Sequence, residues 1–378
     1  MKKLSTAKKG LLFLCFLITT SGCATIPQLG PRYGTHFSDG YIQEHGEKVF
    51  VEIPEVFELS NIAWALAKSD QESDPQTFRD GQYYRDVLAY FSAYKEHPLI
   101  QELSQGEVFA DYFPFRTNSS AYVFEGDRIV HGGIYANTWQ PDVFTKNLEN
   151  VEDFAIQSGF RAFYKDHLPY YQEQIDLYNA CVPVRAMWTW LEERFPTRYG
   201  SYKILFSPLI YASHNTQSFA DGGFTETVMY VAGPQIYRSR GLDEEVEAGL
   251  LARIVFTEID HNYIHNDLSQ YKEEIKEAFA DIDVWNGSRE HEVYYNPKST
   301  FAEYYTWALF ILYAHDAYSP EAYDEITAIT IELMQDGRGF IRFGDFSRVL
   351  LDEYLASPGQ SISDSLPVVL EWAAGQAQ

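Results

Sequence analysis

The sequence predicts an α+β protein that is mainly helical and carries one small antiparallel sheet. Apolar residues recur at three- and four-residue spacing through most of the chain, which is typical of amphipathic helices. A middle stretch, residues 202–231, contains runs rich in β-branched and aromatic residues. With 378 residues, the chain is long enough for one large domain or two modest ones, each with a sizeable core.

The first half of the chain is predicted to form a short strand followed by helices. We expect ordered structure from Lys48, where Val49, Val51 and Ile53 alternate as in a short strand. After Pro54, the apolar positions recur with helical spacing. The predicted helices of this half cover residues 56–66, 83–95 and 151–164, and the last two end at residues 97–98 and 167–169, where proline follows.

The sequence of the middle and the end of the chain predicts the small sheet and a second group of helices. Residues 202–206 and 225–231 are β-rich runs separated by Gly222 and Gly223. A long helix is expected from Leu242 to about Asn266, because the acidic residues at its start suit a helix N-terminus. The remaining helices are predicted at residues 187–194, 268–282, 300–314, 320–335 and 346–355, with a turn at residues 336–339.

The N-terminus indicates export and lipid attachment. A start with four lysines and an apolar run at residues 11–18 precede Ser21, Gly22 and Cys23. This order is typical of a lipoprotein signal peptide, residues 1–22, with Cys23 as the lipidated residue. Thr20 stands where leucine is usual, so an ordinary signal peptide or an uncleaved anchor is the alternative. The predicted location is the cell envelope, either periplasmic or facing the cell surface.

Composition limits the partners and the covalent chemistry. The net charge is −25, so the chain repels nucleic acid and anionic lipid headgroups, and we expect contact with the membrane only through the anchor at Cys23. Cys15 lies in the signal peptide and Cys23 would carry lipid, so Cys181 has no partner for an intramolecular disulfide. Residues 23–47 are rich in proline, glycine and polar residues, which predicts a flexible spacer between membrane and fold.

One segment of the predicted long helix has the spacing of a metal site. Thr257, His261 and His265 lie four residues apart and would share one helical face, with Glu258 on the adjoining edge. Zinc peptidases place two histidines four apart on a helix, and a glutamate next to the first histidine takes a proton from the metal-bound water. Here threonine occupies the first of these positions, and threonine is a poor ligand for zinc.

With these residues in place, the sequence resembles the DUF4932 family of bacterial lipoproteins, whose helix usually carries His-Glu-x-x-His followed by Asn-Pro. Thr257 falls on the first histidine of that motif and His265-Asn266 on the Asn-Pro. The resemblance covers roughly residues 48–355. It rests in addition on Pro-Glu-Val-Phe-Glu-Leu at 54–59, the Tyr-rich helix ending at His97-Pro98, Phe163-Tyr164, Leu-Phe-Ser-Pro-Leu at 205–209, and Glu303.

The resemblance implies a zincin-like core related to metallopeptidases in residues 181–378, after a mainly helical part in residues 48–180. It implies zinc held by His261 and by Glu303 on a downstream helix, with Glu258 as general base if the site is active. Trp307 stands where arginine is commoner in the family. His265 offers a repair of the missing ligand, although Glu303 would then have to shift by about one helical turn, ~5.4 Å.

Three functions follow as hypotheses. The first is an envelope lipoprotein of metallopeptidase ancestry whose metal site is degenerate, and therefore inactive or altered. The second is an active zinc peptidase that uses the repaired site. The third is a non-enzymatic protein that binds a peptide or protein ligand or serves as an envelope scaffold. Without the resemblance, Glu258 and His261 have a simpler explanation, since glutamate and histidine on a helix usually lie on its solvated face.

Overall fold

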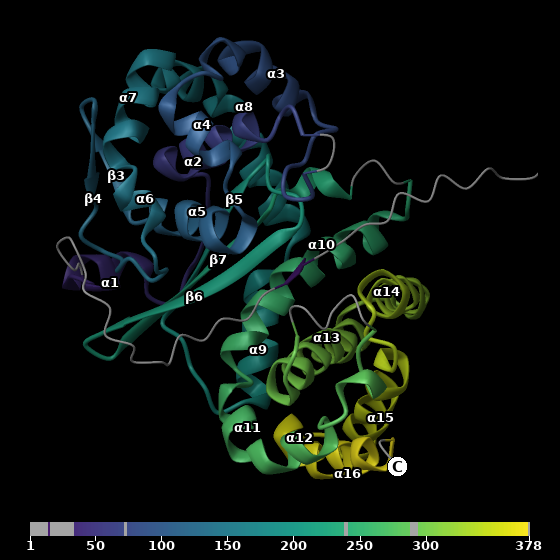
Figure 1. Cartoon of the computed structure of the whole chain (residues 1–378). Coiled ribbons are helices and arrows are strands. Elements are labelled where there is room, and N and C mark those ends of the chain that lie inside the picture. Colours follow the sequence, from purple (N-terminus) through teal and green to yellow (C-terminus); the bar gives the residue numbers. More distant parts are fainter. Residues whose placement is uncertain (1–13, 16–33, 72–73, 238–240, 288–293, 377–378) are drawn as a thin grey trace, which may run out of the picture. The chain divides into compact units, whose positions relative to one another are not determined.

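We describe a computed structural model, in which residues 14–15, 34–71, 74–237, 241–287 and 294–376 are placed well enough to discuss (Figure 1). The chain forms two units. One contains Cys15–Arg185 and Arg198–Gly241, and the other contains Ala186–Thr197 and Leu242–Gln378. The predicted signal peptide and Cys23 lie outside the described residues, apart from the two-residue strand β1 (Leu14–Cys15). The fold is α+β and mainly helical, as the sequence predicts.

The first unit is built on a mixed sheet. Its strands are β2 (Val49–Glu52), β5 (Ser201–Ser207), β6 (Ser213–Asp221) and β7 (Phe224–Ala232), in the order β6-β7-β5-β2 with β1 beside β6. The hairpin of β6 and β7 is antiparallel and turns at Gly222 and Gly223, whose φ values are 57° and 89°. By contrast, β5 runs parallel to both β7 and β2, so the expectation of an antiparallel sheet is wrong for these strands.

Helices supply most of the core of the first unit. The buried α2 packs against α4 and α5, and a separate two-stranded antiparallel sheet is formed by β3 and β4. The bounds are α1 (Asp39–His45), α2 (Glu55–Ala67), α3 (Gln82–Phe91), α4 (Pro98–Ser104), α5 (Phe113–Ser119), β3 (Tyr122–Glu125), β4 (Arg128–His131), α6 (Val143–Lys146), α7 (Leu148–Ser158) and α8 (Phe160–Cys181).

Three elements of this unit differ from the sequence-based expectation. The fold begins before Lys48, because Ser38 caps α1 by accepting a hydrogen bond from the backbone N–H of Tyr41 at 3.2 Å, inside the predicted spacer. The single helix predicted over residues 151–164 is divided at Gly159 (φ 67°) between α7 and α8, and α8 continues through Pro169 to Cys181. Strand β6 was not predicted, since its sequence is mostly polar and lacks the β-rich pattern of its neighbours.

The second unit is helical. Side-chain caps begin its main helices: Asp243 for α10, Asn296 for α13 and Ser319 for α14. Gly249 accommodates the close approach of α10 and α14, because a Cβ there would lie 2.2 Å from the end of the Ile326 side chain, which would have to move. The bounds are α9 (Val184–Arg194), α10 (Glu244–Ile259), α11 (His265–Gln270), α12 (Lys272–Ala278), α13 (Pro297–Ala317), α14 (Pro320–Glu332), α15 (Phe343–Ala356) and α16 (Leu366–Gln376).

The long helix predicted from Leu242 to Asn266 is interrupted. Helix α10 ends at Ile259, a 3₁₀ turn η4 (Asp260–Asn262) follows, and α11 begins at His265. The side-chain amide of Asn262 donates to the backbone carbonyls of Glu258 at 3.1 Å and Ile259 at 3.0 Å, so it satisfies carbonyls that a continuing helix would use. Position 265 therefore does not continue the helical face of position 257.

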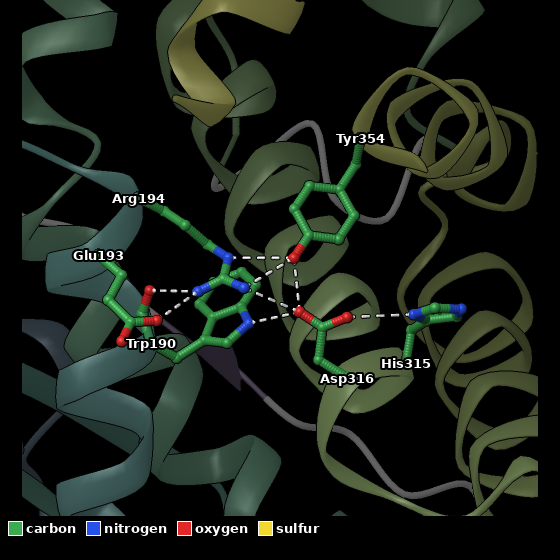
Figure 2. A network of polar contacts seen from close by, with 6 residues as sticks. All are labelled: Trp190, Glu193, Arg194, His315, Asp316 and Tyr354. Atoms are coloured by element: carbon green, nitrogen blue, oxygen red, sulfur yellow. Dashed lines mark hydrogen bonds and ion pairs between the residues drawn. The ribbon is translucent and has the colours of Figure 1, made fainter. Parts of the chain in front are cut away.

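A polar network joins α9 to α13 and α15 within the second unit (Figure 2). One carboxylate oxygen of Asp316 accepts hydrogen bonds from Trp190 Nε1 at 2.8 Å, Arg194 Nη2 at 3.0 Å and the Tyr354 hydroxyl at 2.5 Å. The Arg194 guanidinium lies 4.2 Å from the centroid of the Trp190 ring. Its donors and acceptor are paired with one another, so we assign this network to holding the three helices together.

No helix among the described residues combines the length and the apolar character needed to cross a membrane.

Candidate functional site

The sequence-predicted site residues Thr257, Glu258 and Glu303 are fully buried in the second unit, and His261 is 3% exposed. Thr257 and Glu258 lie in the last turns of α10, His261 in the 3₁₀ turn after it, and Glu303 in the first half of α13. Helices α10 and α13 pack against each other, as do α13 and the 3₁₀ turn. These residues therefore do not decorate a solvated helix face.

Glu303 has a cationic partner, Arg338. Arg338 Nη1 donates to Glu303 Oε1 at 2.6 Å, and Trp307 Nε1 donates to the same oxygen at 2.9 Å. Arg338 Nη2 donates to the Tyr294 hydroxyl at 2.9 Å, and the guanidinium lies 5.0 Å from the centroid of the Trp307 ring. Both charged side chains are completely buried. Burial raises the pKa of Glu303, while the Arg338 charge and hydrogen bonds oppose that rise.

Arg338 lies at the end of a π-helix. It is the last residue of the π-helix η6 (Leu333–Arg338), which directly continues α14 and ends at Gly339 with φ 89°. The sequence predicted a turn for residues 336–339, which is wrong because the wider π turn runs through Asp336 to Arg338 before the chain reverses at Gly339. The widened turn sets the direction from which the Arg338 side chain enters the core.

The Thr257 hydroxyl is engaged within its own helix. Thr257 Oγ1 donates to the backbone carbonyl of Arg253 at 3.0 Å, with a longer contact of 3.4 Å to the carbonyl of Ile254. This back-bonding is common for threonine in helices and directs the hydroxyl along the helix surface. The residue that replaces the first histidine of the motif thus has a local structural role.

Three carboxyl groups are close enough to interact in this core. Burial raises the pKa of Asp260 well above its usual range, and the Glu258 and Glu303 carboxyls raise it further, while the backbone N–H of His261 opposes the shift. Burial and the crowding of like charges thus favour the neutral form of the Asp260 carboxyl. Sequence analysis did not single out Asp260, although it lies within the quoted motif between Glu258 and His261.

His261 is held as the neutral imidazole. Burial, and then the positive charge of Arg338, lower its pKa to about 3. Neither ring nitrogen forms a hydrogen bond with any described residue. Buried polar atoms usually have a partner, and a neutral imidazole is the form that binds metals.

His265 is not brought together with His261. It is the first residue of α11 and is exposed, whereas His261 is buried in the preceding 3₁₀ turn. The interruption after Ile259 removes the four-residue helical register on which the repaired pair depends. The hypothesis of a zinc ligand pair made by His261 and His265 therefore loses its geometric basis.

The residues present do not fit a zinc site of the expected kind. Zinc sites in enzymes have three protein ligands, with open coordination for water. Thr257 is committed to backbone carbonyls, one oxygen of Glu303 is committed to Arg338 and Trp307, and His265 is exposed. Within the described residues, no group of three or more His, Cys, Asp or Glu side chains has the arrangement of a metal site.

Sequence reasoning missed Arg338, which dominates the electrostatics of this core. The sequence offered one indirect indication. Trp307 stands where the family resemblance implies arginine, and in the structure the guanidinium of Arg338 lies over the Trp307 ring. Glu303 and Arg338 are 35 residues apart in the sequence, so no local pattern connects them.

The sequence matches no family model, and comparisons with curated proteins and with solved structures find no match. The family resemblance therefore remains a prediction that rests on the residues quoted for it.

Proposed function

We propose that this chain is a lipid-anchored protein of the cell envelope, related to zinc metallopeptidases, in which an internal ion pair occupies the place of a catalytic metal. The observation that carries the proposal is the buried pair of Glu303 and Arg338. A guanidinium supplies a permanent positive charge to the carboxylate that would otherwise be a zinc ligand. On this proposal the chain works by binding a peptide or protein partner without hydrolysing it.

The buried charges of Glu303 and Arg338 support this proposal. A metal cation beside Glu303 would be repelled by Arg338, whose Nη1 lies 2.6 Å from Glu303 Oε1. Freeing Glu303 for a metal would remove the carboxylate that accepts a hydrogen bond from Arg338 Nη1 at 2.6 Å, although both side chains are completely buried. Separating a buried arginine from its carboxylate partner is costly, and this cost opposes metal binding in the folded protein.

One observation favours an active zinc peptidase as a second candidate. The ring nitrogens of His261 have no hydrogen-bond partner among the described residues, and the ring is neutral. On this alternative His261 is a ligand, Glu258 remains the general base, and Glu303 contributes the oxygen that Arg338 does not contact. The two candidates differ in metal content, which can be measured directly.

Metal content of the full chain, purified in detergent, separates the two candidates. We expect zinc well below one equivalent per chain by mass spectrometry, and no chelator-sensitive cleavage of a peptide library, because Arg338 holds Glu303. His261→Ala should not change the zinc content. The exposed His265→Ala serves as the matched control. Near-stoichiometric zinc that His261→Ala removes and His265→Ala retains would establish the zinc peptidase site instead.

The lipid anchor is tested separately at the predicted cleavage site. We expect the wild-type chain to incorporate labelled palmitate and to lose residues 1–22, because Cys23 is the lipidated residue. Cys23→Ala should remain unprocessed and unlabelled, as seen by intact mass, while Cys181→Ala should behave as wild type. Normal processing of Cys23→Ala without label would show that the N-terminus is an ordinary signal peptide.

A further inference from the structure

A groove lies between α12 and α16 in the second unit. These two helices pack against each other, and both are labelled in Figure 1. The groove has a volume of about 300 Å³, at the lower end of the size of ligand pockets. Its lining residues are Tyr271, Glu274, Glu277, Pro367, Leu370, Glu371 and Ala374.

The lining combines an apolar floor with a carboxylate rim. Leu370, Pro367 and Ala374 provide apolar surface, and Glu274, Glu277 and Glu371 are exposed at the edges. In the described part of the chain, none of the three glutamates takes part in an ion pair within 4.0 Å, whereas Lys272 of α12 pairs with the neighbouring Glu273. Neither Lys272 nor Lys276 of α12 lines the groove.

Tyr271, which lines the groove, is also surrounded by carboxylates. Burial raises the pKa of Tyr271, and the carboxylates of Asp267, Asp364 and Glu274 raise it further. The Tyr271 hydroxyl donates to the backbone carbonyl of Ser363 at 3.4 Å, so the ring is held at the groove with an aromatic surface available beside the carboxylates.

We propose that this groove binds an arginine- or lysine-bearing apolar segment of a partner protein. The methylene stem of such a side chain suits the surface of Leu370 and Ala374, and its cationic head suits the three glutamates and the Tyr271 ring. The net charge of −25 disfavours a second copy of this chain, and the same charge repels anionic lipid. The inference stands whether or not the Glu303 site holds a metal.

The test uses the full chain in detergent and a defined peptide probe, acetylated and amidated Ala-Leu-Arg-Ala-Leu-Arg, labelled with fluorescein. We expect saturable binding by fluorescence polarisation and none for the counterpart with glutamate in place of arginine. The variant Glu274→Gln/Glu277→Gln/Glu371→Gln should weaken binding at least tenfold. Ala374→Trp should weaken it similarly, because the indole fills the groove while every carboxylate remains.

A matched variant separates a specific groove from general attraction to an acidic protein. Asp324→Asn/Glu325→Gln/Glu332→Gln removes three exposed charges from α14, outside the groove. This control should bind the peptide as the wild type does. Equal weakening in both triple variants, or binding that Ala374→Trp leaves intact, would show that net charge alone attracts the probe. Absence of binding to the wild type would overturn the proposal.

Discussion

Arg338→Met is expected to destabilise the second unit by about 3–5 kcal/mol, because it leaves the Glu303 carboxylate buried without its cation. For a unit of this size, that loss lowers the Tm by roughly 10 °C in differential scanning calorimetry of the full chain. Glu303 and Arg338 are both completely buried, so solvent cannot compensate for the missing partner. Trp307 Nε1, which donates to Glu303 Oε1 at 2.9 Å, is a neutral group and cannot replace the lost charge.

A double-mutant cycle identifies the pair as the cause. Glu303→Gln/Arg338→Met removes both charges and should recover most of the lost stability, since a neutral pair carries no uncompensated charge. Arg348→Met is the control, because Arg348 pairs with Asp345 at 2.8 Å on the surface and should cost no more than about 1 kcal/mol. If Arg338→Met and Arg348→Met have equal effects, the buried pair does not have the structural role assigned to it.

Glu58→Gln is expected to remove a large pH dependence of the first unit. Burial raises the pKa of Glu58 to about 8, from an ordinary 4.5, and hydrogen bonds from Tyr83 and Ser207 only partly oppose it. The Tyr83 hydroxyl donates to Glu58 Oε1 at 2.7 Å and contacts the Tyr171 hydroxyl at 2.5 Å. The folded protein thus retains a proton on Glu58 that the unfolded chain has already lost at neutral pH.

Because Glu58 takes up a proton on folding, the free energy of unfolding decreases as the pH rises. The stability linked to Glu58 is fully present below pH 4.5 and is lost as the pH rises through about 8. The free energy of unfolding should fall by about 1.4 kcal/mol per pH unit in this window, on the order of 4–5 kcal/mol in all. Glu58→Gln cannot ionise, so its stability should vary much less between pH 5 and pH 8.5.

Urea unfolding across this pH range measures the effect. Glu58→Gln should match the wild type near pH 5 and exceed it near pH 8.5. Glu149→Gln is the matched control, because Glu149 is exposed at the start of α7 and should leave the wild-type pH profile in place. Parallel profiles for Glu58→Gln and wild type would mean that Glu58 ionises normally in the fold.

Much of the secondary structure was predictable from local pattern. The strand β2 and the helix α2 appear where alternation gives way to helical spacing, and α13 covers the predicted residues 300–314. These segments bury their apolar residues as the pattern requires. Strand β6 was missed because it is mostly polar and is defined by its antiparallel pairing with β7. The end of α10 was missed because apolar residues continue past it at Tyr263 and Ile264.

The candidate site was predictable in part. The motif residues Glu258, His261 and Glu303 lie in one buried core, where coulombic coupling through Asp260 and Arg338 links them, while their predicted roles at a metal stay a prediction. It did not predict that Thr257 bonds to its own helix or that His265 is exposed. The position of His265 depends on where α10 stops, at which point the Asn262 side chain donates to the carbonyls of Glu258 and Ile259.

The sequence by itself determined the basic and apolar N-terminal segment, the net negative charge and the strongly periodic segments such as β2, α2 and α13, because each depends on composition or on neighbours within a few residues. Tertiary structure decided which cation faces Glu303, in which direction the pKa values of Glu58 and Asp260 shift, and where a groove forms between α12 and α16. Those outcomes depend on burial and on charges brought from distant segments, as Arg338 is brought to Glu303 across 35 positions.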